Sequence, residues 1–153
     1  MVCTVKGITL TPSQIDKCYL NSSKHGVDKL VSFERQNYLS TTFDDNTFDV
    51  VWAIESVCYA FDKLDFLTEA YRVLKPGGRL IVADFYAEKL EAGTKDAELM
   101  KKWSDSWAIK AYANTDEFTD KCQQAGFENT LVRNVTKNVL PSIKRLYYYF
   151  FPG

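Results

Sequence analysis

The sequence predicts a single α/β domain, residues 1–153, whose mostly parallel sheet carries helices on both faces. Strand-sized apolar runs alternate along the chain with segments in which apolar residues recur at helical spacing. This alternation is typical of βαβ units with right-handed crossovers. The run Phe48–Ile54 is almost continuously apolar, as in a central strand buried on both faces. A length of 153 residues suits one domain.

The first elements have clear local signals. The β-branched run Val2–Ile8 predicts a strand. A helix is expected from Thr11 to about residue 25, because Thr11 and Gln14 have the spacing of a capping box. Pro12 suits the first helical position, where a missing amide costs nothing. Gly26 can close the helix.

The remaining elements follow from periodicity and turn residues. Apolar residues recur at helical spacing over 64–74, and the Pro-Gly-Gly at 76–78 ends that helix. Asn114, with Glu117 three residues later, predicts the start of another helix. The expected elements after the first helix are strands at 30–33, 48–54, 79–84 and 128–136, and helices at 64–74, 94–109, 114–125 and 140–151.

Composition argues against several classes of function. Lys and Arg (19) nearly balance Asp and Glu (20), so no large field of one sign would attract nucleic acid or an anionic membrane. No apolar run approaches the roughly 20 residues that span a bilayer, and the start lacks the features of a signal peptide. We therefore expect a cytoplasmic protein. The four scattered cysteines, with a single histidine, predict reduced and mostly buried thiols and no metal site.

Candidate chemistry lies where the predicted strands end, because ligands of parallel sheets bind beyond the carboxyl ends. The segments to consider are 7–14, 36–43, 53–62 and 84–88. Glu55 directly follows the most apolar strand, where a carboxylate is costly unless it is used or paired, and is therefore a candidate catalytic residue. The alternative for Glu55 is a charge near a helix N-terminus. Tyr59 could steer a proton, stack on a substrate, or simply pack.

Three segments together resemble one known family in order and spacing. They read Gly-Ile-Thr-Leu-Thr-Pro-Ser-Gln at 7–14, Phe-Asp-Val-Val-Trp-Ala-Ile-Glu-Ser at 48–56 and Arg-Val-Leu-Lys-Pro-Gly-Gly-Arg-Leu at 72–80. The chain thereby resembles class I S-adenosylmethionine-dependent methyltransferases, in the branch of sterol C-methyltransferases, tocopherol methyltransferases and cyclopropane fatty acid synthases. The resemblance implies a Rossmann-like sheet, S-adenosylmethionine as cofactor and no metal. It also implies a lipophilic acceptor of sterol, prenyl-quinol or fatty-acyl type.

The same resemblance implies roles for individual residues. The cofactor-binding residues near the ribose would be Ile8, Thr9 and Gln14, together with Gly7. Asn37 and Tyr38 would lie near the adenine edge. Ala53 and Ile54 would present their backbone to the methionine moiety. Glu55 and Tyr59 would handle the proton or the developing positive charge. Asn37 replaces the family's usual aspartate as a neutral and weaker acceptor. Tyr59 stands where sterol methyltransferases tend to carry histidine.

One family feature is not found. No Gly-x-Gly motif occurs in the chain, and the family's first strand and its glycine-rich turn would precede Val2. In the family that strand lies between those expected at 2–8 and 48–54. The resemblance therefore implies a partial domain with two unpaired strand edges, and the family's final strands are not found either. A rearranged sheet, a strand supplied by another chain, and a truncated product all remain open.

Other interpretations compete with the enzyme. The chain could be a non-catalytic partner module that pairs through its strand edges, including as a homodimer. A dehydrogenase is disfavoured because no dinucleotide fingerprint is present. Trp103 and Trp107, one helical turn apart, could roof a lipophilic substrate, but we expect them in the core. The aromatic segment 140–151 could be a substrate lid, a membrane-surface helix or an exposed edge.

Overall fold

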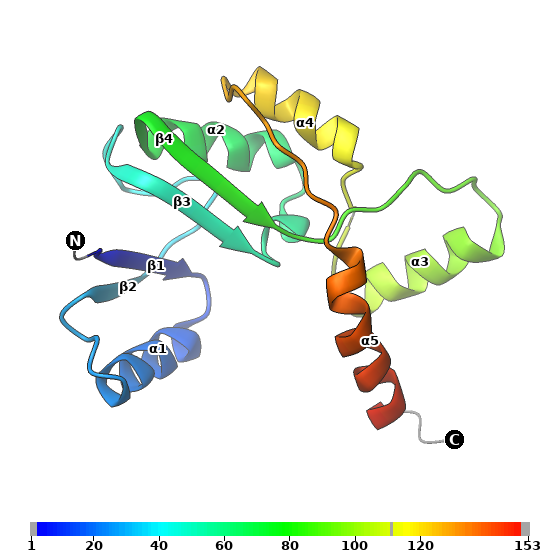
Figure 1. Ribbon diagram of the computed structural model, residues 1–153, viewed down its shortest axis with the longest axis horizontal. Helices are drawn as coiled ribbons and strands as arrows, with labels where there is room; N and C mark the ends of the chain where they lie inside the picture. The colour runs from blue at the N-terminus through cyan, green and yellow to red at the C-terminus, as the bar shows by residue number, and fades with distance from the viewer. Residues whose placement is uncertain (1–2, 111, 151–153) are drawn as a thin grey trace.

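A computed structural model describes residues 3–110 and 112–150 of the chain (Figure 1). The predicted class, α/β with parallel strands, is confirmed. The elements in chain order are β1 (Val5–Thr9), α1 (Pro12–Lys24), β2 (Val31–Arg35), β3 (Phe48–Ile54), the 3-10 helix η1 (Val57–Tyr59), α2 (Lys63–Val73), β4 (Leu74–Ala83), α3 (Lys95–Ser106), α4 (Thr115–Gln124) and α5 (Thr136–Phe150).

The strands of the described residues form two separate parallel pairs. β1 pairs with β2, with Val5 opposite Val31, and β3 pairs with β4, with Ile54 opposite Ala83. α1 lies on one side of the strands, and α2 and α4 lie on the other (Figure 1). No described strand joins β1 to β3, so each of these two strands keeps one unpaired edge.

The core lies between the β3–β4 sheet and the helices α2 and α4. Leu67 of α2 is fully buried, and the side chain of Asp62 caps α2 by accepting from the Leu64 N–H. The helical periodicity read over 64–74 is therefore confirmed within a residue at each end. The buried cluster comprises Ala53, Val57, Ala60, Phe66, Leu67, Ala70, Ala113, Phe118 and Cys122.

β3 has the predicted bounds, but the expectation that it is buried on both faces is wrong. Val51 and Ala53 face the core, whereas Val50, Trp52 and Ile54 are 42%, 69% and 54% exposed. Successive side chains of a strand point to opposite faces. Within the described residues a helix covers only the first of these faces, so the second face remains apolar and open.

The strand expected at 128–136 is also wrong. Residues 127–135 are irregular, and Leu131 and Val132 are 73% and 55% exposed. A strand needs a neighbour to pair with its N–H and C=O groups. This segment leads from α4 to α5 as an irregular trace (Figure 1), and no described strand pairs with it.

The expectation that Trp103 and Trp107 lie in the core is wrong as well. Their side chains are 56% and 54% exposed, and their ring centroids lie 5.9 Å apart. None of the residues of α3 is buried, and the helix stands away from both sheets (Figure 1). The periodicity of the sequence predicted a helix correctly, but the helix has no partner surface here that would bury the two rings.

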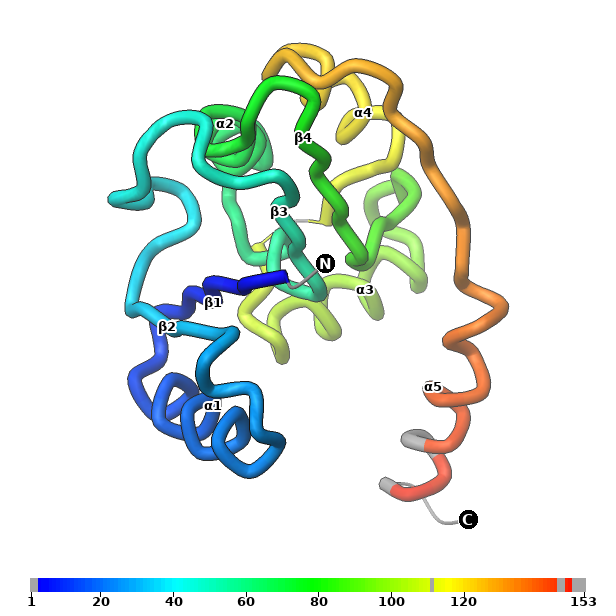
Figure 2. The backbone as a smooth tube through the Cα atoms, turned by 60° about the vertical axis from the view of Figure 1, so that its left-hand side comes forward, coloured from blue at the N-terminus to red at the C-terminus, as the bar shows by residue number. Residues whose placement is uncertain are grey.

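The connection from β2 to β3, residues 36–47, passes from one sheet to the other without a helix (Figure 2). Two side chains of α2 hold it. Glu69 Oε1 accepts from the backbone N–H and the hydroxyl of Thr41, at 2.8 and 2.6 Å, and Arg72 donates to the Phe43 carbonyl oxygen at 2.8 Å. Arg72 also donates to Glu69, and these hydrogen bonds lower the pKa of Glu69 to about 2.

α5 begins four residues earlier than expected and contains Pro141. Pro141 is the sixth residue of this helix, so it has no N–H to donate to the carbonyl oxygen of Lys137, four residues earlier. Tyr148 and Tyr149 are 70% and 77% exposed, and the helix points away from the β3–β4 sheet in both views (Figure 1, Figure 2). No helix among the described residues is both long and apolar enough to cross a bilayer.

Candidate active site

The segment after β3 carries both predicted catalytic residues. Glu55 has a left-handed backbone, with a φ of 46°, and its N–H donates to the carbonyl oxygen of Ala83 at 2.8 Å. Its side chain is exposed, so the premise that it is a buried carboxylate is wrong. The turn directs the chain from β3 into η1 and leaves the side chain of Glu55 in solvent. Tyr59, at the end of η1, is half exposed.

Asp84 holds the backbone of this segment from the neighbouring strand. Its Oδ2 accepts from the N–H groups of Ser56 and Cys58, at 3.1 and 3.0 Å. Burial, and then the negative charge of Asp84, raises the pKa of the Cys58 thiol to about 11. Sequence reasoning named the segment 84–88 as a place to search but assigned Asp84 no role.

Two further side chains bind the same backbone. The hydroxyl of Tyr38 donates to the Ser56 carbonyl oxygen at 3.1 Å, and Lys63 Nζ donates to the carbonyl oxygens of Cys58 and Ala60. Burial raises the pKa of Tyr38 and lowers that of Lys63. The segment 55–60 is thus held from three elements: the loop after β2, the helix α2 and the end of β4. No pattern in the sequence indicated that Lys63 would be buried.

The segment after β1 brings together two residues expected near the ribose. Thr9 Oγ1 donates to Gln14 Oε1 and accepts from the Thr11 N–H at 3.2 Å. The predicted capping box is therefore wrong. The Thr11 side chain makes no cap hydrogen bond, and the Gln14 N–H donates to the Thr11 carbonyl oxygen at 3.1 Å. Thr9 binds the Thr11 N–H and the Gln14 side chain, which were expected to bond to each other. Pro12 does occupy the first helical position, as predicted.

Gly7 and Ile8 lie within β1. A Cβ on Gly7 would lie 2.8 Å from Cδ1 of the Phe33 ring, so close packing of the two strands accounts for glycine at this position. Ile8 is half-buried and sits opposite Glu34 in the strand pair. The pKa of Glu34 is lowered by hydrogen bonds from Lys6 and Gln36. Both Gly7 and Ile8 are therefore explained by the packing and pairing of β1.

Asn37 shapes the loop after β2. Its Oδ1 accepts from the Leu39 N–H at 3.0 Å, and its carbonyl oxygen accepts from the Ser40 N–H at 3.1 Å. This is an Asx turn, which uses one lone pair of the amide oxygen. One lone pair remains for a donor such as an exocyclic amine.

Ala53 and Ile54 end β3. Both pair with β4 on one edge, opposite Val82 and Ala83. Their other edge has no strand partner among the described residues. Its backbone groups are therefore available for a ligand with a charged amino-acid tail.

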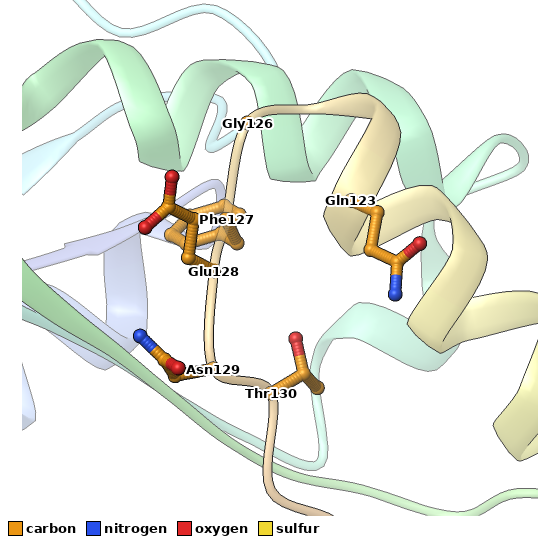
Figure 3. Close-up of a pocket in the computed structure, with 6 residues that line it drawn as sticks. All are labelled: Gln123, Gly126, Phe127, Glu128, Asn129 and Thr130. Carbon is orange, nitrogen blue, oxygen red and sulfur yellow. The ribbon is translucent and has the colours of Figure 1, made fainter.

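The two described hollows contain none of the residues predicted to bind or react. One, of about 200 Å³, lies next to the segment 55–60 and is lined by Phe61, Asp62, Lys63, Tyr112, Ala113, Glu117 and Lys121. The other, of about 410 Å³, is lined by Gln123, Gly126, Phe127, Glu128, Asn129 and Thr130. Figure 3 shows the last residues of this second hollow along one strip of backbone after α4. It brings together no set of groups for catalysis.

Comparison with known proteins identifies the family. Residues 1–82, a little over half of the 153-residue chain, match the family described as "Methyltransferase domain". The chain is 32% identical over 139 residues to 27-O-demethylrifamycin SV methyltransferase of Amycolatopsis mediterranei, covering 90% of this chain and 50% of that protein. It is 28% identical over 140 residues to the chloroplastic tocopherol O-methyltransferase of Arabidopsis thaliana, covering 88% of this chain and 40% of that protein.

Solved structures agree on the fold. A geranyl diphosphate methyltransferase in complex with SAM superimposes with a TM-score of 0.84 at 22% identity, over 95% of this chain and 57% of that one. This chain spans about half the length, or less, of the two curated relatives named above. The family match and the shared Rossmann-like fold confirm the predicted family and fold class. The chain therefore belongs to the S-adenosylmethionine-dependent methyltransferase domain family.

Proposed function

We propose that this protein transfers a methyl group from S-adenosylmethionine to a lipophilic small molecule of sterol, prenyl-quinol or fatty-acyl type. The observation that carries the proposal is the segment 55–60, whose backbone is anchored by Tyr38, Lys63 and Asp84 at the carboxyl end of β3. Such anchoring suits a site that must keep donor and acceptor aligned. Relatives named for tocopherol and for a 24-methylenesterol support the acceptor class.

The groups at the strand ends suit parts of the cofactor. Thr9 and Gln14 supply polar groups for the ribose hydroxyls, and Asn37 supplies an amide oxygen for the adenine amine. The unpaired edge at Ala53 and Ile54 supplies backbone groups for the amino-acid tail. These residues form one side of a cofactor site.

Little covalent chemistry is required of the protein. S-adenosylmethionine supplies a sulfonium carbon with its own leaving group, so the protein mainly orients the two reactants and handles one proton. In this proposal the exposed carboxylate of Glu55 takes that proton, and Tyr59 lies four residues further along the same anchored segment. Both side chains reach solvent, so an acceptor can approach them.

Calorimetric titration with S-adenosylmethionine tests the first half of the proposal, and transfer of an isotope-labelled methyl group to a sterol, a prenyl-quinol and a fatty-acyl ester tests the second. We expect Glu55→Gln to keep cofactor binding and to lose transfer by roughly 10²–10⁴-fold, the range for a general base. Glu91→Gln, which makes the same change at a remote turn, serves as the control. A well-folded chain that does not bind the cofactor would contradict the proposal.

A second candidate function, a partner module, is favoured by one observation. β1 and β3 each have an edge that pairs with no described strand, and the face next to the β3 edge exposes Val50, Trp52 and Ile54. Unpaired edges accept strands from other chains. We propose a second copy of this chain as the partner.

A further inference from the structure

Asp84 is the first residue after β4, and its carboxylate reaches sideways to the segment after β3. Oδ2 accepts from the Ser56 and Cys58 N–H groups at 3.1 and 3.0 Å, while Oδ1 accepts from the Phe85 N–H at 2.8 Å. Both oxygens are therefore occupied by backbone donors. Asp84 forms no ion pair with a side chain among the described residues within salt-bridge distance, and the N–H groups that it binds belong to the backbone.

Hydrogen bonds to the end of β4 hold the backbone on both sides of the Glu55 side chain. The Glu55 N–H donates to Ala83, and the next N–H along the chain, that of Ser56, donates to Asp84. Two consecutive amides of one strand end are thus held by two consecutive residues of the neighbouring strand. Glu55 itself has a φ of 46°. A left-handed backbone is costly for a residue with a Cβ and persists where its surroundings over-determine it.

The hydrogen bonds of Asp84 are of the strong kind. A carboxylate that accepts backbone N–H groups forms charge-assisted bonds, which are about twice as strong as neutral ones. The site is partly buried: Cys58 is 5% exposed and Asp84 is half-buried. Burial, and then the negative charge of Asp84, raises the pKa of the Cys58 thiol. Other side chains hold the carbonyl oxygens of this segment, and Asp84 is the side chain that accepts from its amides.

We propose that Asp84 is a positioning residue for methyl transfer, which fixes Glu55 and the end of β3 through the amides of Ser56 and Cys58. This inference rests on the proposed function. Asp84 does not touch the reacting groups. It sets the direction of the Glu55 side chain and keeps the backbone at Ala53 and Ile54 in place for the cofactor.

The test uses the full chain and three variants. In Asp84→Ala both amide bonds are lost, and in Asp84→Asn one neutral acceptor oxygen remains. Asp49→Asn makes the same charge change at the opposite end of β3, where the side chain pairs with Lys75 at the surface. Two quantities are measured: site-resolved amide hydrogen exchange, and the Kd for S-adenosylmethionine by calorimetry.

We expect exchange at Ser56 and Cys58 to accelerate by roughly 100-fold in Asp84→Ala and roughly 10-fold in Asp84→Asn, the loss expected for charge-assisted bonds. The core amides of Leu67 and Ala70 should keep their protection in Asp84→Asn. The cofactor Kd should rise roughly 10-fold in Asp84→Ala and less in Asp84→Asn. Asp49→Asn should match the wild type in both measurements.

The outcomes separate this inference from the proposed function. If the wild-type chain binds the cofactor and Asp84→Asn leaves the exchange of Ser56 and Cys58 unchanged, the role of Asp84 is overturned and the function stands. Exchange that accelerates equally at Leu67 and Ala70 would show a general structural role and would also overturn it. If the wild-type chain does not bind S-adenosylmethionine, the function fails, and the positioning role fails with it.

Discussion

The hydroxyl of Tyr38, in the loop after β2, donates a hydrogen bond to the carbonyl oxygen of Ser56, in the segment after β3, over 3.1 Å. β2 and β3 belong to sheets that share no strand pairing among the described residues. The bond therefore links the ends of two separate sheets. It also links a residue predicted at the adenine edge to the segment that carries Glu55.

Tyr38→Phe removes this hydrogen bond and keeps the ring, which packs edge-on against Phe66 with the two ring centroids 5.6 Å apart. We expect the free energy of unfolding to fall by about 1 kcal/mol in urea titration, the usual net value of one hydrogen bond. Tyr71→Phe is the matched control, because the Tyr71 ring packs edge-on against Phe127 in the same way and is half exposed. An equal loss in both variants would show that the bond to Ser56 adds no stability.

The ion pair between Glu69 and Arg72 predicts a dependence of stability on pH. The pKa of Glu69 is lowered from 4.5 to about 2 in the folded chain, first by the hydrogen bond from Arg72. A lowered folded-state pKa stabilises the fold above pH 4.5, and this contribution is lost as the pH falls toward 2. The contribution of Glu69 to the free energy of unfolding amounts to at most about 3 kcal/mol.

In Glu69→Gln the free energy of unfolding should fall less than in the wild type as the pH is lowered from 4.5 to 2. Chemical denaturation at several pH values, compared with the wild type, measures the difference. Asp105→Asn, which breaks an exposed pair with Lys101 on α3, is the control and should leave the curve almost unchanged. Parallel curves for Glu69→Gln and the wild type would contradict the assigned pKa.

Gly7→Ala tests whether Gly7 serves packing. The added Cβ would lie 2.8 Å from the Phe33 ring, so we expect a loss of about 1–3 kcal/mol in the free energy of unfolding from overpacking. In a Phe33→Leu background the same change should cost about 1 kcal/mol less, because the ring that it meets is gone. Equal costs in both backgrounds would show that the ring does not restrict this position.

The sequence predicted the elements best where the signal is local. The bounds of β3 match those expected from its apolar run, and α4 begins after Asn114, whose Oδ1 accepts from the Asp116 N–H. The capping box predicted at Thr11 is wrong, because Thr9, from the preceding strand, binds the Thr11 N–H and the Gln14 side chain. The predicted burial of Trp103 is wrong, because burial depends on a partner surface that residue spacing cannot reveal.

The site was predicted as a set of strand ends but not as a set of contacts. The apolar run at 48–54 predicts a strand, and Glu55 follows it directly in the sequence. Asp84 lies beside Ser56, 28 positions earlier in the sequence, because β3 and β4 pair in a register that places Ile54 opposite Ala83. The buried Lys63 has no sequence signal, because its environment is made by carbonyl oxygens of a turn.

Trp52 tests the proposed pairing with a second copy. Its side chain is 69% exposed in the middle of β3, between the exposed Val50 and Ile54, and a contiguous apolar surface of this kind favours association. We expect the wild-type chain to self-associate with increasing concentration in light scattering, and Trp52→Lys to shift it toward the monomer. Trp103→Lys removes an equally bulky exposed ring from α3 and should associate as the wild type does. A wild-type chain that stays monomeric throughout the series, or equal shifts in the two variants, would exclude this face of β3 as the interface.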